Sequence, residues 1–171
     1  MFDVVDQKIL LFLQEDARIS NAEIARRLGM AASGIFERIR KLEERGVLQG
    51  YTAILDPASV DLGLLAYVFV RTEDPVGGDA TARALAKRPE IQEVHHVAGE
   101  DCYLVKVRVK DTQGLSALMK EIGAVKGVRS TRTTVVLEST KETSRLPLEG
   151  AARTKGNPKA AGAAKAKREA K

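Results

Sequence analysis

The stretch ISNAEIARRLGMAASGIFERIRKLEERG, residues 19–46, decides how the amino-terminal part of this chain folds. Ser20 is a good N-cap for a helix, and Glu23 three residues later completes the pattern of a capping box. Apolar residues then recur at helical spacing as far as Gly29, which predicts that the first helix ends there. A second helix is expected to open near Ser33, so the stretch predicts a helix-turn-helix.

The second helix of this hairpin has an apolar stripe and a charged remainder. Ile35, Ile39 and Leu42 fall at i, i+4 and i+7, so they are expected to point into a core. We expect Glu37, Arg38 and Lys41 to turn outward. Arg40 is expected nearer the edge of the apolar stripe. A basic outer side suits a helix that lies in a DNA groove, and the alternative is a generic helical hairpin with a solvated charged surface.

The flanking residues complete this predicted domain. Upstream, Asp3 is expected to cap a helix with an apolar stripe formed by Val5, Ile9, Phe12 and Leu13. A third helix is needed because two short helices alone are marginally stable. Downstream, VLQGYTAIL, residues 47–55, is typical of an extended arm, and Asp56 and Pro57 are expected to end it.

Two stretches of this region resemble the leucine-responsive regulator/AsnC family of transcription factors. They are VDQKILLFLQEDARISNAEIARRLGM, residues 5–30, and RIRKLEERGVLQGYTAILDP, residues 38–57, and the resemblance extends to about Glu138. Members usually carry Ser-Pro near the start of the recognition helix, where this chain has Ala31, Ala32 and Ser33. The resemblance implies a winged-type helix-turn-helix domain over residues 1–50 and a linker over residues 51–61.

A second pattern follows over residues 62–140. The stretches LGLLAYVFVR (62–71), IQEVHHVAG (91–99), CYLVKVRVK (102–110) and VRSTRTTVVLE (128–138) are typical of strands. Helices capped by Asp79 and Thr112 are expected between the first and second strands and between the third and fourth. The order βαββαβ predicts a ferredoxin-like fold, so the fold class is α+β. By resemblance, this is the family's ligand-sensing and oligomerising domain, called ACT-like or RAM.

The first of these strands is apolar in both directions. Leu65, Tyr67 and Phe69 point one way, and Ala66, Val68 and Val70 the other. Two helices cover only one face of such a sheet, so the uncovered apolar face predicts burial against a partner. The resemblance implies a homodimer built sheet against sheet, and assembly of dimers into rings such as an octamer.

The turn between the second and third strands is the candidate effector site. Family members commonly carry Gly-x-x-Asp there, and this chain has Gly99 followed by Glu100 and Asp101, with Cys102 at the family's aspartate position. The resemblance implies an amino-acid effector where dimers meet. We expect it to contact Gly99, Glu100, Asp101, Cys102 and the hydroxyls of Thr133 or Thr134. The alternative is a tight turn in which Gly99 adopts a left-handed conformation without any ligand.

The charge of the chain is concentrated at its carboxyl end. Its 28 Lys and Arg residues and 23 Asp and Glu residues give a net charge of +5. From Arg145 onward there are eight basic and two acidic residues, which leaves 20 basic and 21 acidic residues before it. The DNA-binding hypothesis therefore rests on local pattern. Residues 141–171, rich in Ala, Lys and Gly, predict a disordered tail, which is either a nonspecific phosphate-binding arm or a solubilising extension.

Signals for catalysis, metal binding or export are weak. His95 and His96 are adjacent on a strand, so they face opposite sides and cannot share one metal ion. Cys102 is the single cysteine and has no evident catalytic partners, which argues against a nucleophile and against an intrachain disulfide. We therefore expect no enzyme, no catalytic residue, no metal, no cofactor and no membrane segment. The expected location is the cytoplasm, in association with the nucleoid.

These patterns predict a sequence-specific transcription regulator that binds double-stranded DNA and is modulated by an amino acid. Residues 33–45 would enter the major groove, with Ser33 and Gly34 near the bases. Arg38 and Lys41 would reach bases or phosphates, and the residues expected to hold the DNA backbone are Arg26, Arg27 and Arg40. The alternatives are an architectural DNA-compacting protein with weak sequence preference and an amino-acid-binding regulatory subunit of an enzyme.

Overall fold

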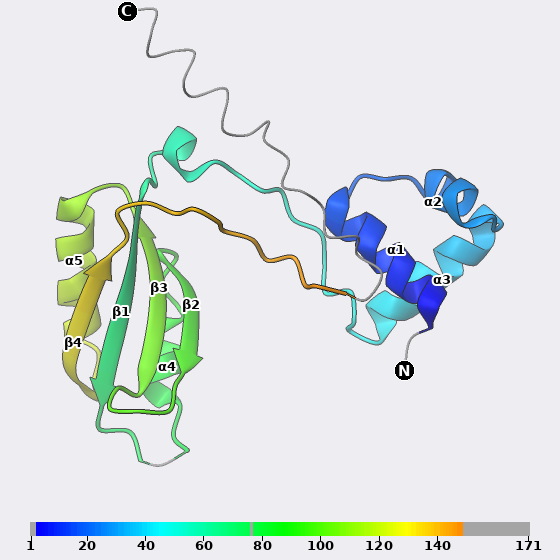
Figure 1. The fold of residues 1–171 in the computed structure, drawn as a ribbon. Coiled ribbons are helices and arrows are strands. Elements are labelled where there is room, and N and C mark those ends of the chain that lie inside the picture. The colour runs from blue at the N-terminus through cyan, green and yellow to red at the C-terminus, as the bar shows by residue number, and fades with distance from the viewer. Residues whose placement is uncertain (1–2, 76, 149–171) are drawn as a thin grey trace, which may run out of the picture. The chain divides into compact units, whose positions relative to one another are not determined.

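The computed structural model describes residues 3–75 and 77–148, and it divides the chain into two compact units. The first unit contains residues 1–53 together with the residues from 143 onward, and the second contains residues 54–142 (Figure 1). The predicted disordered tail lies outside the described residues from position 149 onward. Within residues 141–148, the first part of the predicted tail, Glu142 pairs with cationic residues of the second unit, and Arg145, Leu146 and Leu148 contact the first unit.

The first unit is a bundle of three helices, as the sequence predicts. These are α1 (Val4–Glu15), α2 (Asn21–Leu28) and α3 (Ala32–Glu44). The tight turn after α2 is possible because Gly29 adopts a left-handed conformation with φ +66°. The helices share one apolar core, whose buried residues are Ile9, Leu10, Leu13, Ile24, Ala25, Ile35, Ile39 and Leu42.

The capping of these helices differs in detail from expectation. Asp3 and Asp6 form a reciprocal capping box, because each backbone N–H donates to the other residue's carboxylate, at 3.1 and 2.8 Å. Ser20 does cap α2 by accepting from the N–H of Glu23 at 3.1 Å. The Glu23 carboxylate, however, pairs with arginines of α2, so this second box is only half formed.

A late segment of the chain joins the first unit. The Gln14 side-chain amide, near the end of α1, accepts from the N–H of Leu146 at 2.6 Å and donates to its carbonyl at 3.2 Å. An amide side chain has both a donor and an acceptor, so it satisfies both backbone groups of one extended residue. Arg145 donates to the carbonyl of Glu15 at 3.4 Å, and Leu148 packs against the three-helix core. This attachment explains why residues 143–148 belong to the first unit.

The predicted extended arm over residues 47–55 is not a strand. Residues 49–56 have no regular secondary structure, and a short 3₁₀ helix, η1 (Pro57–Val60), follows. A strand requires hydrogen bonds to a neighbour, and no described strand pairs with this segment. Ile54 and Leu55 are consequently 83% and 65% exposed.

The second unit is the predicted ferredoxin-like α+β fold. Its elements are β1 (Leu64–Thr72), α4 (Ala80–Leu85), β2 (Ile91–His96), β3 (Tyr103–Val109), α5 (Thr112–Gly123) and β4 (Val128–Val135). The strands are antiparallel in the order β2-β3-β1-β4, and both helices pack on one face of the sheet (Figure 1). Ala66, Val68 and Val70 are fully buried on that face.

The caps of α4 and α5 correct two sequence-based expectations. Asp79 makes no cap hydrogen bond and pairs instead with Arg83 at 2.8 Å. Asp74 reaches over from the end of β1, because its carboxylate accepts from the N–H of Thr81 at 3.2 Å and from the Thr81 hydroxyl at 2.9 Å. The cap of α5 is Asp111 rather than Thr112, since the Asp111 carboxylate accepts from the N–H of Gly114 at 2.9 Å.

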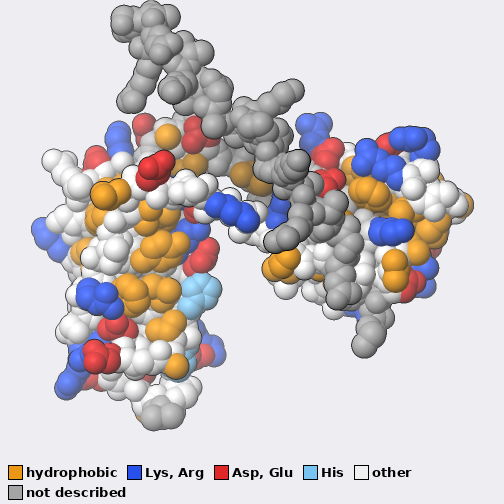
Figure 2. All heavy atoms as spheres, in the orientation of Figure 1, with side chains coloured by type: hydrophobic (Ala, Val, Ile, Leu, Met, Phe, Trp, Pro, Cys, Tyr) orange, Lys and Arg blue, Asp and Glu red, His pale blue; other side chains and the backbone are white. Residues whose placement is uncertain are grey.

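The opposite face of the sheet carries no helix among the described elements. Tyr67 and Phe69 are half-buried there, and apolar side chains gather over this sheet in Figure 2. Glu142 lies 2.7 Å from both Lys106 and Arg108, so the cationic positions of β3 are neutralised within the unit. No helix among the described residues is long and apolar enough to cross a membrane.

Candidate nucleic-acid interface and effector site

The exposed side of α3 carries four of the eight DNA-binding residues that the sequence nominates. Ser33, Glu37, Arg40 and Lys41 are exposed, while Ile35, Ile39 and Leu42 are buried as expected. Gly34 is half-buried, and a Cβ at that position would lie 3.8 Å from the Met30 methyl group. The helix begins at Ala32, one residue before the expected Ser33, and Ala31 supplies no side-chain cap.

The exposed side of α3 is less basic than the sequence suggests. Arg40 lies 2.8 Å from Glu37 and 3.3 Å from Glu44, and these carboxylates, the first of them most, raise the Arg40 pKa. Such exposed pairs are weak and exchange readily with solvent or with another anion. Arg40 is therefore available to a phosphate only if it leaves these carboxylates.

Arg38 is half-buried and paired with two carboxylates, whereas the sequence predicts a side chain that turns outward. It lies 2.7 Å from Asp6 and 2.8 Å from Asp3, both at the start of α1. Position 38 is i+3 from Ile35 and i−4 from Leu42, so helical geometry places its side chain beside the apolar stripe. The hydrogen bonds that Arg38 donates to Asp6 and, to a smaller extent, to Asp3 raise the Arg38 pKa. The Asp3 pKa is lowered first by the Asp6 backbone N–H and then by Arg38.

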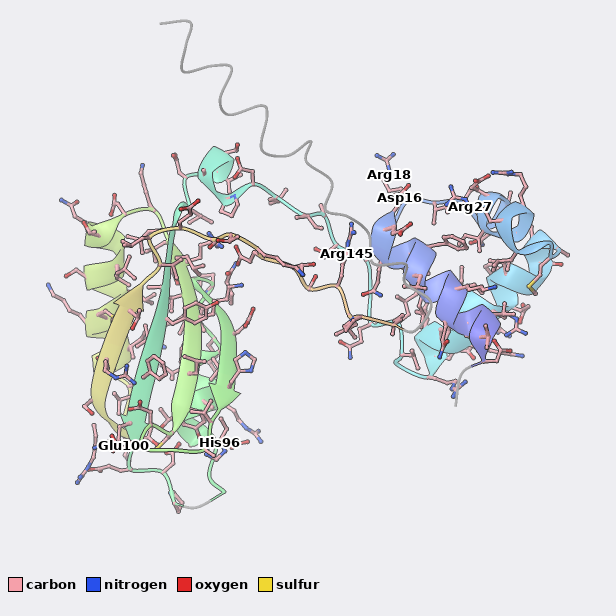
Figure 3. The ribbon with its side chains drawn as sticks, viewed as in Figure 1. Asp16, Arg18, Arg27, His96, Glu100 and Arg145 are labelled. Atoms are coloured by element: carbon pink, nitrogen blue, oxygen red, sulfur yellow. The ribbon has the colours of Figure 1, made fainter. Side chains whose placement is uncertain are left out.

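Arg26 and Arg27 lie at the carboxyl end of α2 and share one carboxylate. Glu23 is 2.8 Å from Arg26 and 2.7 Å from Arg27, and these hydrogen bonds lower the Glu23 pKa from its ordinary value of 4.5 to about 2. The Arg27 guanidinium also lies 5.2 Å from the centre of the Phe12 ring (Figure 3). The Arg26 side chain is 73% exposed and the Arg27 side chain 43% exposed, so both can be reached by DNA phosphates.

The predicted effector turn lies between β2 and β3. Gly99 has φ +141°, a conformation that residues with a side chain rarely adopt. Glu100 is exposed, and its backbone carbonyl accepts from Arg71 at 3.2 Å (Figure 3). Asp101 is only 22% exposed and lies 3.0 Å from Arg132 of β4. The turn is thus bordered by two carboxylates and by two arginines from neighbouring strands.

Cys102 is part of the packing beneath this turn. Its backbone N–H donates to the carbonyl of Val70 at 3.0 Å, and its sulfur lies 3.5 Å from the backbone nitrogen of Thr72. The side chain is half-buried against the core of the second unit. The residue at the family's aspartate position therefore points its thiol at β1.

The two threonines of the predicted site are not brought to the turn together. Thr133 and Thr134 face opposite sides of β4, and the Thr133 hydroxyl donates to the Met119 sulfur on the helical face at 3.4 Å. Thr133 of β4 pairs with Val68 of β1, and Val68 in turn pairs with Val105 of β3. Val105 lies three residues, or about 10 Å along the strand, from Cys102, so Thr133 is distant from the turn. The neighbouring Arg132 approaches the turn instead.

Sequence reasoning missed Arg71 and Arg132 as neighbours of the effector turn. Both are cationic residues on the face of the sheet opposite the helices, and the Arg132 guanidinium lies 4.0 Å from the centre of the Phe69 ring. The sequence does show that Arg71 and Arg132 alternate along their strands with residues that face the helices. Their proximity to Glu100 and Asp101 depends on strand order and register, which no local pattern contains.

The two histidines lie on opposite faces of β2, as expected. His95 is 3.1 Å from Glu93, and His96 packs against the Tyr103 ring with centroids 5.2 Å apart (Figure 3). Among the residues that the structure describes, no group of three His, Cys, Asp or Glu side chains is arranged to hold a metal ion.

Comparison with protein families matches both units. A model described as Lrp/AsnC ligand binding domain matches residues 65–146, and one described as winged helix-turn-helix DNA-binding matches residues 2–49. The transcriptional regulator FL11 of Pyrococcus horikoshii is 39% identical over 147 residues, covering 86% of this chain and 97% of that relative. The leucine-responsive regulatory protein of Escherichia coli is 40% identical over 150 residues, covering 86% and 92%.

Solved structures give the same match over nearly the whole described chain. A transcriptional regulator from Neisseria meningitidis, in complex with L-methionine, has a TM-score of 0.80 at 31% identity and covers 87% of this chain and 98% of that chain. A feast or famine regulatory protein from Mycobacterium tuberculosis, also with L-methionine, has a TM-score of 0.79 at 33% identity, covering 85% and 99%.

Proposed function

Because the chain belongs to the Lrp/AsnC family of transcription regulators, we propose that α3 is its recognition helix and enters the major groove of DNA. The protein is a DNA-binding transcription regulator, and its relatives are regulators rather than enzymes. The division of α3 into two sides carries the assignment of the recognition helix. One side is buried in the three-helix core, and the other is exposed along its length.

The exposed residues of the first unit have distinct roles in this proposal. Ser33 and Gly34, at the amino end of α3, approach base edges, because the first residues of a recognition helix reach deepest into the groove. The Glu37 carboxylate can accept from a cytosine amino group. The cationic residues that bind phosphates are Arg26, Arg27, Arg40 and Lys41. Arg38 acts differently, since its ion pairs hold α3 against the start of α1.

The effector part of the proposal is an amino acid bound at the Gly99 turn. Its ammonium group would pair with Glu100 and Asp101, and its carboxylate with Arg71 and Arg132, the four charged groups beside the turn. Two structural neighbours are complexes with L-methionine, which supports an amino acid as the ligand class. Calorimetry with each of the twenty amino acids tests it, because heat from none of them would indicate an effector-independent regulator.

The oligomer is part of the same proposal. The uncovered face of the sheet, with Tyr67 and Phe69 half-buried in a single chain, packs against a second copy, and the dimers associate further. Sedimentation at micromolar concentration tests this proposal, since a monomer would contradict it.

The location of the protein is also part of the proposal. The excess of basic residues from Arg145 onward supports nucleoid association in the cytoplasm. Imaging of a fluorescent fusion over stained DNA tests it.

Selection from random DNA followed by competition tests the main function. A sequence-specific regulator enriches a defined site and binds it about 1,000-fold or more tightly than bulk DNA. A low ratio would favour an architectural DNA-compacting protein, the alternative that the basic residues after position 150 suggest. Two-fold dimers further predict pseudo-palindromic sites with half-sites about one helical turn apart.

A further inference from the structure

Phe36 is an aromatic residue exposed on the proposed recognition helix. Its neighbour Ile35 is fully buried, yet Phe36 is 54% exposed. It lies in the first half of α3, at i+3 from Ser33 and i−4 from Arg40. Residues at these spacings are neighbours on a helix surface, so Phe36 lies between a proposed base contact and a proposed phosphate contact.

The surroundings of Phe36 include the start of α2, the helix that precedes α3 in the chain. A depression in the first unit is lined by Phe36 and Arg40 of α3, Asn21 of α2, Leu13 of α1 and Tyr51, among others. Asn21 is the first residue of α2. When a helix-turn-helix docks, the recognition helix lies in the groove and the preceding helix crosses the DNA backbone. Phe36 and the first residue of α2 thus line the same depression, together with residues of α1 and of the segment after α3.

We propose that Phe36 is a specificity-determining residue that contacts the C5-methyl group of a thymine in the major groove. A phenyl ring offers no hydrogen bond, and the thymine methyl is the one apolar group that base pairs present in that groove. The other base edges present amino, carbonyl or ring-nitrogen atoms, and a ring packed against these desolvates them without replacing their hydrogen bonds. The inference rests on the proposed function of α3 and adds a base preference to it.

Among the residues described in the first unit, Tyr51 is another exposed aromatic residue, and it lines the same depression. Tyr51 is 51% exposed, but its hydroxyl donates to the Glu43 carboxylate at 3.0 Å and so has an internal partner. The phenyl ring of Phe36 has no hydroxyl or other polar group, so it cannot form a hydrogen bond of this kind. Its exposed ring gains most from an apolar group in the groove.

The experiment is a thymine-to-uracil scan of the site obtained by selection. Deoxyuridine replaces each thymine of one half-site in turn, which removes only the methyl group. The full-length protein is expected to lose about fourfold in affinity at one position, the value of one buried methylene-sized group. F36A is expected to bind the thymine and uracil sites equally, and F36L to keep part of the preference.

The matched control is K41A, on the same exposed side of α3. It is expected to weaken binding to the thymine and uracil sites by the same factor, because a phosphate contact carries no base information. Uniform affinity of the unsubstituted protein across the scan overturns the inference, as does an unchanged thymine preference in F36A or in F36L. If no DNA site is selected at all, the proposed function itself fails, which is a separate result.

Discussion

The guanidinium of Arg38 in α3 lies 2.7 Å from a carboxylate oxygen of Asp6 in α1. The Asp6 side chain is only 13% exposed. The nearby Asp3 carboxylate accepts from the same arginine nitrogen at 2.8 Å. Helix α3 is thus held to α1 through a charged contact beside the apolar core. The orientation of α3 depends on this contact as well as on the packing of Ile35, Ile39 and Leu42.

Replacing Arg38 with alanine is expected to lower the free energy of unfolding of the first unit by about 1–3 kcal/mol. The change removes charge-assisted hydrogen bonds and leaves the Asp6 carboxylate without its cationic partner. Urea unfolding measures the loss. K41A, at an exposed position of the same helix, is expected to stay within about 0.5 kcal/mol. Equal stability of R38A and K41A would show that the Arg38 contact has no structural role.

Glu23 is expected to titrate in the folded protein at a pH near 2, well below its ordinary value of 4.5. Arg26 and Arg27 stabilise the ionised form, so the folded pKa is the lower one. The resulting stabilisation is present above pH 4.5 and is lost as the pH falls toward 2. NMR titration of the carboxyl carbon measures the midpoint. E23Q is the control for unfolding, because it should flatten that part of the acid dependence.

Gly127 to alanine is expected to destabilise the second unit by about 1–3 kcal/mol. Gly127 has φ +97°, and a Cβ would lie 2.7 Å from the Thr81 hydroxyl oxygen, within the contact through which Asp74 caps α4. G123A is the matched control, because a Cβ at the end of α5 meets no atom within 4 Å. That change is expected to be neutral or stabilising by up to about 1 kcal/mol. Thermal unfolding of both variants measures the difference.

Arg132 to alanine is expected to reduce or abolish the heat of binding of whichever amino acid the protein binds. Arg132 lies 3.0 Å from Asp101, and the proposal assigns the ligand carboxylate to this arginine. D101N is expected to act in the same direction through the ammonium group. T133V serves as the control, because the Thr133 hydroxyl faces Met119 of α5 rather than the turn. Loss of binding in T133V, with R132A unaffected, would place the ligand elsewhere.

Deleting residues 150–171 is expected to weaken nonspecific DNA binding and to flatten its dependence on salt. The deleted segment contains seven Lys and Arg residues and one Glu. For every phosphate that the shortened chain no longer neutralises, the slope of log K against log salt becomes shallower by about 0.9. Titrations of the full chain and the shortened chain at several salt concentrations measure both slopes. Identical slopes would leave the segment as a solubilising extension.

Much of the fold was predictable because its signals are local. The stripe of Ile35, Ile39 and Leu42 predicted which side of α3 is buried, and the order βαββαβ predicted a sheet with two helices on one face. Caps were less predictable, since several residues near a helix start can supply an oxygen. Asp79 was the nearest candidate for α4, but Asp74, five residues earlier, does the capping because β1 ends close to the helix.

The candidate site was predictable only where one element forms it. Ser33, Glu37, Arg40 and Lys41 share the exposed side of a single helix, so helical periodicity was enough to group them. The effector turn draws on three segments, and periodicity could not show that Arg132, rather than Thr133, reaches Asp101. The ion pairs of Arg38 were not predictable for a related reason, because its partners Asp3 and Asp6 lie more than thirty residues earlier, at the start of α1.

The two-part α+β organisation, the buried stripe of each helix and the resemblance to a family of DNA-binding regulators all follow from the amino-acid sequence. Hydrophobic periodicity and turn residues act over a few positions, so they can be read directly from the chain. Three contacts are visible only in the folded chain: Arg38 pairs with Asp3 and Asp6, Cys102 packs under the predicted effector turn, and Gln14 bonds Leu146. Each of these contacts joins residues distant in the chain, and their distances are set by helix packing and strand register.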